Sequence, residues 1–317
     1  MDEAMYDSDM YTLESGNESM FKDYTALYNA VDSLDNPDHI GFTEDYFQSS
    51  FSTSNIDLER DVVLVRNSNG NLIASGIISV HNNPTSTSRL IIQVHPACRR
   101  QGIGSRVLHH LTELGLARGS SEFICRFPSF RPYVVSFARK HGFIHDYSWI
   151  KMQIKHKEPV PTPSLPWGLT VRGLNIKKEL EVWATIQNSI FKDYPNYEMV
   201  DVEKLKSLTE HSSFDRNLIV LCVVSGKPVG YGYGLSITSE TGEKTLKISG
   251  MGILPEHRRN RYGQALLYEL LNRAYIKGHT SSELVVLSTN RRAIRLYEKC
   301  GFSERYKYFW YKRVFEL

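Results

Sequence analysis

Apolar and polar positions along the first half of the chain predict an alternation of strands and helices. Short runs that are apolar, or that alternate with polar residues, are typical of strands when turn residues bound them. Apolar residues three and four positions apart are typical of helices. Val107, Leu111 and Leu114 show the helical spacing. The pattern predicts strands at 61–66, 72–80, 88–95, 122–126 and 147–154, and helices at 102–118 and 132–141.

The second half of the chain repeats this order. The pattern predicts strands at 218–224, 228–237, 244–254, 283–288 and 306–313, and helices at 263–277 and 292–300. In the first half, Pro96 ends a strand and Gly104 lies in the turn that opens a helix. Pro255 and Gly263 have the same spacing and the same places in the second half. The period is too long for a solenoid, so the repeat indicates a duplicated domain.

A proline-rich segment, Lys157–Gly168, separates the two halves. Proline neither continues a helix nor donates a hydrogen bond within a central strand, so this segment is typical of a linker. We expect an N-terminal domain at 1–155, a linker at 156–168 and a C-terminal domain at 169–317. The length of 317 residues agrees with two domains of about 150 residues each.

Composition and charge exclude several kinds of protein. The net charge of +3 is too small to indicate nucleic-acid binding. The four cysteines have neither metal-ligand spacing nor the pattern of a disulfide framework, so we expect reduced thiols and no metal site. No apolar stretch reaches the roughly 18 residues of a membrane span, and no secretory signal begins the sequence. We therefore expect a cytoplasmic monomer or homodimer that binds no membrane.

The segment Val94–Gly104, VHPACRRQGIG, has the features of a phosphate-binding loop. The free N–H groups and the positive dipole end of a following helix attract a pyrophosphate, and glycine allows it to approach the backbone. Arginines add charge-assisted hydrogen bonds. A strand-to-helix turn with solvated arginines has the same residues, so the loop alone does not decide. Val107, in place of a third glycine, excludes the dinucleotide-binding fingerprint, and no Gly-Lys-Ser/Thr follows, which excludes a Walker A loop.

The segment Ile253–Gly263, ILPEHRRNRYG, is the second copy of this loop. Arg261 stands where the first copy has Gly102. Arginine still has a backbone N–H, so we expect the amide cradle to persist with a negative φ at Arg261. Together with Arg258 and Arg259, this residue makes the second loop the more basic one.

The first loop resembles the acetyl-CoA loop of the GNAT superfamily of N-acetyltransferases, Val-x-Pro-x-x-Arg-x-x-Gly-Ile-Gly. The segment Asn290–Phe302 resembles the other GNAT signature, Asn-x-x-Ala-x-x-Leu-Tyr-x-x-x-Gly-Phe, at every defined position. This resemblance implies an α/β (α+β) protein with two tandem GNAT domains, each a mixed, mostly antiparallel central sheet flanked by helices. It also implies acetyl-CoA as co-substrate. The residues that it assigns to the coenzyme are Val94, Arg99, Arg100, Gly102, Ile103 and Gly104 in the first half, and Ile253, Arg258, Arg259, Arg261, Tyr262, Gly263, Gln264, Ala265 and Asn290 in the second.

The same resemblance assigns Tyr297 to catalysis, with its hydroxyl directed at the thioester sulfur. A phenol with a pKa of about 10 stays protonated at neutral pH and is able to protonate a departing thiolate as a general acid. Asn290 precedes Tyr297 by about two helical turns, so both side chains face the same side. In the alternative interpretation, Tyr297 is a core aromatic residue beside Leu296.

The first half departs from this signature. When the halves are aligned on the Gly-Phe pair that ends each signature, Arg131 stands at the asparagine position and Ala138 at the tyrosine position. Alanine has no proton to donate. We therefore expect a binding or scaffolding N-terminal domain and a catalytic C-terminal domain. Glu243 lies in the turn before the strand that leads to the second loop, Glu256 lies after that strand, and Glu283 begins the next strand. Each is typical of a surface charge, and we assign no base.

These features predict an enzyme that transfers an acetyl group from acetyl-CoA to a primary amine of a small molecule. Two GNAT domains in a chain of this length resemble the mycothiol synthase-like tandem acetyltransferases, which Phe191–Pro195 and His211–Asp215 fit loosely. A protein or peptide N-acetyltransferase and a non-catalytic acyl-CoA-binding sensor remain alternatives. The sequence leaves open the acceptor, the acyl-chain length, and whether one or both domains bind the coenzyme.

Overall fold

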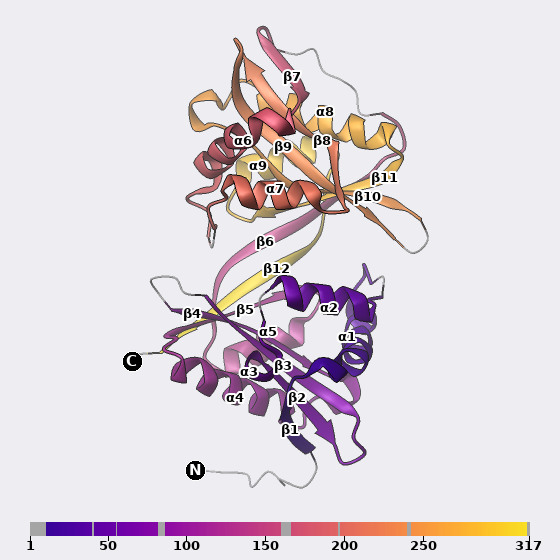
Figure 1. Cartoon of the computed structure of the whole chain (residues 1–317), viewed down its shortest axis with the longest axis vertical. Coiled ribbons are helices and arrows are strands. Elements are labelled where there is room, and N and C mark those ends of the chain that lie inside the picture. Colours follow the sequence, from indigo (N-terminus) through magenta and orange to yellow (C-terminus); the bar gives the residue numbers. More distant parts are fainter. Residues whose placement is uncertain are drawn as a thin grey trace. The chain divides into compact units, whose positions relative to one another are not determined.

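The structure, a computed structural model, describes residues 11–39, 41–54, 56–81, 86–159, 166–195, 197–239 and 242–315 (Figure 1). The chain divides into two compact units. Unit 1 consists of residues 1–148 and 308–317, and unit 2 of residues 149–307. Within the described ranges, no helix combines the length and the apolar character needed to cross a bilayer.

Unit 1 contains a mixed sheet with the strand order β1-β2-β3-β4-β5-β12. All neighbours in it are antiparallel except β4 and β5, which are parallel. The strands are β1 (Tyr11–Ser15), β2 (Val62–Asn67), β3 (Leu72–His81), β4 (Thr87–Val94), β5 (Glu122–Pro128) and β12 (Ser303–Val314). The helices are η1 (Glu18–Met20), α1 (Phe21–Asp35), α2 (Glu44–Thr53), α3 (Leu58–Asp61), η2 (Pro96–Cys98), α4 (Ile103–Ala117) and α5 (Pro132–Lys140).

Helices cover both faces of the sheet in unit 1, because the side chains of a strand alternate between its faces. Val62 and Leu64 of β2 belong to the core beneath α1 and α2. Val63 and Val65 of the same strand belong to a second core, beneath α4 and α5. An entirely apolar run of the sequence therefore becomes a strand that is buried on both sides.

Unit 2 contains a sheet with the strand order β6-β11-β10-β9-β8-β7, in which β10 and β11 are the parallel pair. The strands are β6 (Ile144–Lys155), β7 (Leu169–Gly173), β8 (Phe214–Val224), β9 (Lys227–Thr238), β10 (Lys244–Ile253) and β11 (His279–Leu287). The helices are α6 (Ile176–Phe191), α7 (Val202–Glu210), η3 (Pro255–His257), α8 (Tyr262–Ile276) and α9 (Arg291–Lys299). Leu218 and Val220 of β8 pack beneath α8, whereas Ile219 and Leu221 pack beneath α6 and α7.

The two mixed, mostly antiparallel sheets with flanking helices confirm the expected fold class. Helices α4, α5, α8 and α9 lie where the apolar spacing predicts them. Helices α1, α2, α6 and α7 lie in segments for which we made no prediction. These four helices cover the second face of each sheet. The sequence pattern therefore predicts the helices on one face of each sheet and not those on the other.

The units differ from the expected continuous domains at two strands. Residues 149–155 of β6 pair antiparallel with β11, in the sheet of unit 2. Residues 308–314 of β12 pair antiparallel with β5, in the sheet of unit 1, where Figure 1 shows the yellow β12 beside β5. Ile150 and Met152 accordingly lie in the core of unit 2, and Tyr311 lies in a core of unit 1. Alternation along a strand predicts its two faces but not its partner, so the exchange leaves no mark in the pattern. Residues 160–165 of the expected linker lie outside the described residues.

The exchanged strands predict where core truncations destabilise the protein. We expect Tyr311→Ala to lower protection against hydrogen exchange in unit 1, by about 3–5 kcal/mol, because the buried ring packs against Phe127 at a centroid distance of 5.1 Å. Met152→Ala should lower protection in unit 2, by about 2–5 kcal/mol. Site-resolved hydrogen exchange with mass spectrometry measures both. Loss of protection in the opposite unit for either variant would contradict the exchange.

Candidate active site

In unit 2 the parallel strands β10 and β11 separate before they end. Their parallel register ends at the pair Ile248 and Leu284, although β10 continues to Ile253 and β11 to Leu287. A β-bulge on β10, between Ile248 and Gly250, marks the same place on its other side. A cavity of about 1570 Å³ lies where the strands separate, lined by both strand ends, the η3–α8 loop, α9 and the end of α6. Pockets for one ligand usually enclose about 300–1,000 Å³, so this cavity has room for two substrates.

The loops that precede α4 and α8 have the same backbone conformation. In the first loop, Arg100 and Gly102 have φ values of 64° and 81°; in the second, Arg259 and Arg261 have φ values of 73° and 60°. The expectation of a negative φ at Arg261 is therefore wrong. Arg261 is the N-cap of α8, and the tight connection from η3 needs a left-handed residue there, which glycine supplies in the other loop. The arginine preserves the cradle by adopting the conformation of the glycine.

One arginine in each loop fixes the loop to the preceding strand. Arg258 Nε donates to the carbonyl oxygen of Ile253 at 3.0 Å, and Arg99 Nε donates to the carbonyl oxygen of Val94 at 3.3 Å. The terminal nitrogens of each guanidinium are not used in these bonds. The first turn of α8, with the free N–H groups of any helix start, lies beside this fixed charge and forms an anion-binding end of the cavity.

Most of the residues expected to contact the coenzyme line a cavity. Those in unit 2 are Ile253, Arg258, Arg259, Arg261, Tyr262, Gly263, Gln264 and Asn290. Those in unit 1 are Val94, Arg99, Arg100, Gly102 and Gly104. Ile103 and Ala265 are instead buried in the hydrophobic cores, with exposures of 2% and 3%, so their side chains contribute to packing.

Asn290 is held in place at the N-terminus of α9. Its Oδ1 accepts the backbone N–H of Ala293 at 3.1 Å, and its Nδ2 donates to the Tyr194 hydroxyl at 2.8 Å. Sequence reasoning did not identify Tyr194 as a site residue. It lies far from Asn290 along the chain, and the only available signal was the loose resemblance of Phe191–Pro195. Trp149 and Phe191 pack against the Tyr194 ring, with centroid distances of 6.1 and 5.1 Å.

Tyr297 lies in the same cavity and is buried, with an exposure of 8%. Burial raises the pKa of its phenol well above the usual value, and the neighbouring Tyr194 and Cys300 raise that pKa further. Tyr297 therefore stays protonated throughout the physiological pH range. It also packs on Phe302 at a centroid distance of 5.9 Å, so the ring has a core contact as well as access to the cavity.

The three carboxylates considered from the sequence have different surroundings. Glu283 is paired with Lys151 at 2.9 Å, and Glu243 lies in the turn between β9 and β10, away from the cavity lining. Glu256 lines the cavity, and so does Asp193, which sequence reasoning did not single out.

Unit 1 has a smaller version of this cavity. The parallel register of β4 and β5 ends at the pair Leu90 and Cys125, while the two strands continue to Val94 and Pro128. The cavity there measures about 830 Å³. Ala138, with an exposure of 3%, lies at the position that corresponds to Tyr297, so this cavity has no counterpart of the Tyr297 hydroxyl at that position.

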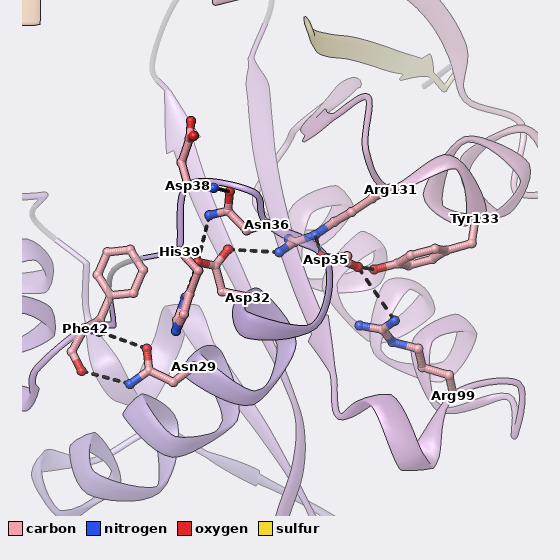
Figure 2. Close-up of polar contacts among 10 residues, drawn as sticks. All are labelled: Asn29, Asp32, Asp35, Asn36, Asp38, His39, Phe42, Arg99, Arg131 and Tyr133. Atoms are coloured by element: carbon pink, nitrogen blue, oxygen red, sulfur yellow. Dashed lines mark hydrogen bonds and ion pairs between the residues drawn. The ribbon is translucent and has the colours of Figure 1, made fainter. Parts of the chain in front are cut away.

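Arg99, Arg131 and Tyr133, which line the unit 1 cavity, belong to a cluster of charged and polar residues (Figure 2). Arg131, at the position that corresponds to Asn290, donates from Nε to Asp35 at 2.7 Å and from Nη2 to Asp32 at 3.0 Å. The Tyr133 hydroxyl donates to the other oxygen of Asp35 at 2.6 Å. Arg99 lies 4.0 Å from that oxygen and stacks on the Tyr133 ring at 4.6 Å. Asp35, at the end of α1, thus binds both the start of α5 and the phosphate-loop arginine.

Residues of the loop after α1 make further contacts with Asp32 of this cluster (Figure 2). Asn36 Nδ2 and His39 Nδ1 both lie 2.9 Å from the second oxygen of Asp32. Asn29 exchanges two hydrogen bonds of 2.9 Å with the backbone of Phe42. Asn36 and His39 therefore hold the Asp32 carboxylate in place for its contact with Arg131.

Comparison with known proteins supports the repeat seen in the chain. A model of the acetyltransferase (GNAT) family matches residues 26–143 and residues 181–302. A mycothiol acetyltransferase of Thermobispora bispora is 26% identical over 212 residues, which cover 66% of this chain and 70% of the relative. A mycothiol acetyltransferase of Renibacterium salmoninarum is 23% identical over 236 residues, which cover 73% of this chain and 69% of the relative.

Two solved structures have the same fold along nearly the whole chain. A GCN5-related N-acetyltransferase from Sphaerobacter thermophilus has a TM-score of 0.79 and 20% identity, and the match covers 96% of this chain and 95% of that one. A tandem GNAT protein from the clavulanic acid biosynthesis pathway has a TM-score of 0.74 and 14% identity, with coverage of 96% and 98%.

The left-handed conformation of Arg261 predicts an unusual response to substitution. We expect Arg261→Gly to keep or raise the midpoint of thermal unfolding. Glycine adopts positive φ without the backbone strain of about 1–2 kcal/mol that arginine has there, and the greater entropy of its unfolded chain offsets only part of this gain. Arg261→Val should lower stability by about 1–3 kcal/mol, because a branched side chain resists positive φ. Scanning calorimetry measures both variants. Equal destabilisation by glycine and valine would contradict the assigned conformation.

The charged cluster of unit 1 predicts a large effect at Arg131. Its removal leaves Asp32 and Asp35, with side-chain exposures of 8% and 16%, without their main cation. We expect Arg131→Ala to destabilise unit 1 by about 3 kcal/mol, measured by hydrogen exchange in α1 and α5. Arg139→Ala, an exposed arginine of the same helix, is the control and should change stability by less than about 0.5 kcal/mol. If Arg131→Ala changed stability as little as the control does, the cluster would contribute no stability.

Proposed function

The chain belongs to the acetyltransferase (GNAT) family, and on this basis we propose that it transfers the acetyl group of acetyl-CoA to a primary amine of a small molecule. We assign the reaction to unit 2, with Tyr297 as the general acid. The observation that carries this proposal is the buried, protonated Tyr297 hydroxyl in a cavity whose other end is a basic, N–H-rich helix start.

The coenzyme has the shape and charge that this cavity suits. Its pyrophosphate would bind the first turn of α8, with Arg258, Arg259 and Arg261 beside it, because helix N-termini and guanidinium groups both bind phosphate. Its pantetheine arm would lie between the separated ends of β10 and β11, where the backbone groups of Gly250–Ile253 lie beyond the parallel register. The thioester would then reach Tyr297.

The proposed reaction is a direct transfer. The amine nitrogen attacks the thioester carbonyl carbon, the C–N bond forms, and the C–S bond breaks. Tyr297 donates its proton to the departing sulfur, which yields free coenzyme A, and the amine loses one proton. Glu256 and Asp193 supply the carboxylates of the cavity lining that are available to take this proton, directly or through water.

We propose that unit 1 binds the coenzyme or serves as a scaffold without transferring the acetyl group. Its phosphate loop has both glycines and the same backbone conformation as the loop of unit 2. Ala138 offers no proton, and the Arg131–Asp35 cluster occupies the side on which unit 2 presents Asn290 and Tyr194. The smaller cavity agrees with a site that has lost room for an acceptor.

A small-molecule acceptor is supported by the relatives, which are mycothiol acetyltransferases, and by the walls of the cavity in unit 2. Trp149, Phe191 and Tyr194 form an aromatic cluster in the lining of this cavity. Aromatic side chains provide a rigid surface for small organic molecules and attract an ammonium group before it is deprotonated.

Substitution of Tyr297 tests this proposal. We expect Tyr297→Phe to lower kcat at least 100-fold, the usual contribution of a general acid being about 10²–10⁴, while the KM for acetyl-CoA changes less than about twofold. In the wild type, raising the pH through about 10 should not remove activity, because the raised pKa keeps the active, protonated phenol in place. Steady-state assays of coenzyme A release over a panel of amines measure both.

The control is Arg100→Ala, which changes the unit 1 loop and should leave kcat within about twofold. Loss of activity in Arg100→Ala together with full activity in Tyr297→Phe would move the reaction to unit 1. Binding of acetyl-CoA without turnover on any amine would instead favour a coenzyme sensor.

A further inference from the structure

The hydroxyl group of Tyr194 is held by one hydrogen bond and keeps a proton to donate. Tyr194 belongs to the segment after α6, is half-buried and lines the cavity of unit 2. Its oxygen accepts a hydrogen bond from Asn290 Nδ2 at 2.8 Å. A phenol both accepts and donates, so this bond leaves its proton available. Among the described residues, no group accepts that proton. The hydroxyl is therefore able to donate to a ligand in the cavity.

The position of this hydroxyl is fixed from three sides. Trp149 and Phe191 pack on the ring at centroid distances of 6.1 and 5.1 Å, and the backbone N–H of Tyr194 donates to the carbonyl oxygen of Phe191 at 2.8 Å. Asn290, which holds the hydroxyl, is itself bonded to the backbone of Ala293. A donor fixed in this way stabilises a developing negative charge without first having to reorganise.

Tyr194 and Tyr297 serve the same part of the cavity. Asn290 is the N-cap of α9, and Tyr297 follows it by seven residues, on the same side of the helix and about 10 Å along its axis. Long side chains of a helix point back toward its N-terminus, so the Tyr297 hydroxyl is displaced toward Asn290, to which Tyr194 is bonded. The raised pKa of Tyr297, to which Tyr194 contributes, agrees with this placement. A thioester that meets Tyr297 therefore lies beside Tyr194 as well.

The proposed reaction leaves one atom that needs such a donor. The sulfur receives its proton from Tyr297, and the amine nitrogen uses its lone pair to attack the carbonyl carbon. The carbonyl oxygen of the thioester becomes negatively charged during this attack, and hydrogen-bond donors at such an oxygen are among the largest contributions to catalysis of acyl transfer.

Unit 1 offers neither of the two hydroxyl groups at the corresponding places. Ala138 stands at the position of Tyr297. Arg131, at the position of Asn290, is bonded to the carboxylate of Asp35 rather than to a tyrosine. An ionised carboxylate has no proton to donate and repels a negatively charged oxygen. The two donors are thus present together in unit 2, where we place the reaction, and replaced together in unit 1.

We propose that Tyr194 is a second catalytic tyrosine, which donates a hydrogen bond to the carbonyl oxygen of the thioester and stabilises the charge that develops there. The inference rests on the proposed function, since it describes a further residue of the same reaction. Tyr194 keeps its proton throughout, whereas Tyr297 transfers one to the sulfur. Two tyrosines from distant segments of the chain thus act on the two ends of the bond system that reacts.

The first test detects the hydrogen bond without an acceptor. Acetyl-CoA labelled with ¹³C at the carbonyl is bound to the protein, and the carbonyl stretch is recorded by infrared spectroscopy. Binding to the wild type should shift the stretch to lower frequency, and Tyr194→Phe, which keeps the ring, should lose part of this shift. The difference between the two spectra reports on unit 2, because unit 1 is the same in both. An identical carbonyl band in the two proteins would overturn the proposal.

Tyr197→Phe is the matched control for Tyr194→Phe. Tyr197 lies in the same segment, but its hydroxyl already donates to Asn188 Oδ1 at 2.7 Å and has no proton for a substrate. This variant should keep the carbonyl shift and a kcat within about twofold of the wild type. If it lost the shift as Tyr194→Phe does, the loss would reflect a disturbed segment and the proposal would fall.

The second test separates the effect on kcat from the effect on binding. We expect Tyr194→Phe to lower kcat about 100-fold, the usual result of removing one donor to such an oxygen, while the KM for acetyl-CoA changes less than about threefold. Steady-state release of coenzyme A on an amine that the wild type acetylates measures both constants. A variant that changed KM alone would show that Tyr194 only binds the coenzyme, and would overturn the role proposed here.

A double-mutant cycle distinguishes direct contact from an effect through Asn290. Asn290→Ala removes the partner of the Tyr194 hydroxyl and leaves the hydroxyl itself in place. If Tyr194 acts on the thioester, Tyr194→Phe should lower kcat at least tenfold further in the Asn290→Ala background. No further loss in that background would show that Tyr194 acts only by positioning Asn290, and would overturn the direct contact.

The outcomes separate this inference from the proposed function. Turnover of an amine with the same kcat in Tyr194→Phe and the wild type would overturn the role of Tyr194 and leave the acetyltransferase assignment standing. Bound acetyl-CoA without turnover of any amine would overturn the proposed function and the role of Tyr194 in catalysis, and the carbonyl band would still decide whether Tyr194 bonds the thioester.

Discussion

Each unit depends on a pair of parallel strands that stop pairing before they end. Backbone N–H and C=O groups in a protein interior need partners, and strand ends beyond the last ladder bond have lost theirs on one side. In unit 2 the bulge at Gly250 and the early end of the register at Ile248 create this edge in the middle of the sheet. The helix that starts beside it adds N–H groups of its own. The residues to which we assign a function lie around this opening, because the backbone groups there lack ladder partners and are available to bind a ligand.

The two units show how one architecture accommodates different side chains at this opening. Asn290 caps its helix and reaches Tyr194, whereas Arg131 at the same position reaches two carboxylates of α1. Asp32 and Asp35 supply the negative charges that this buried guanidinium needs, and Asp35 also binds Tyr133 and lies beside Arg99. The substitution thus converts an open polar wall into an ion-paired one. The cavity of unit 1 has about half the volume of that in unit 2, in keeping with this change.

The sequence predicted those parts of the structure that depend on local spacing. Strand alternation, the helical faces of α4 and α8, and the duplicated loops all follow from neighbouring residues, and the structure has them. The sign of φ at Arg261 was predicted wrongly, because general preferences of arginine were weighed above the turn geometry that the matching glycine revealed. Tyr194 escaped notice for another reason: its role arises from a contact with Asn290, which lies far away in the chain, and no local pattern encodes such a contact. The partners of β6 and β12 are non-local in the same way.

The exchange of β6 and β12 has a consequence for how the protein is made. A chain leaves the ribosome from its N-terminus at about 5–20 residues per second, and domains usually fold as they emerge. Unit 1 ends its first segment at Ser148 and regains the chain only at Tyr308, roughly 160 residues and about 8–32 seconds later. Until then the edge of β5 has no neighbour, and an open strand edge invites pairing with other chains. The nascent protein therefore passes through a period of vulnerability that two consecutive, self-contained repeats would avoid, and a chaperone that covers this edge would be most useful during that interval.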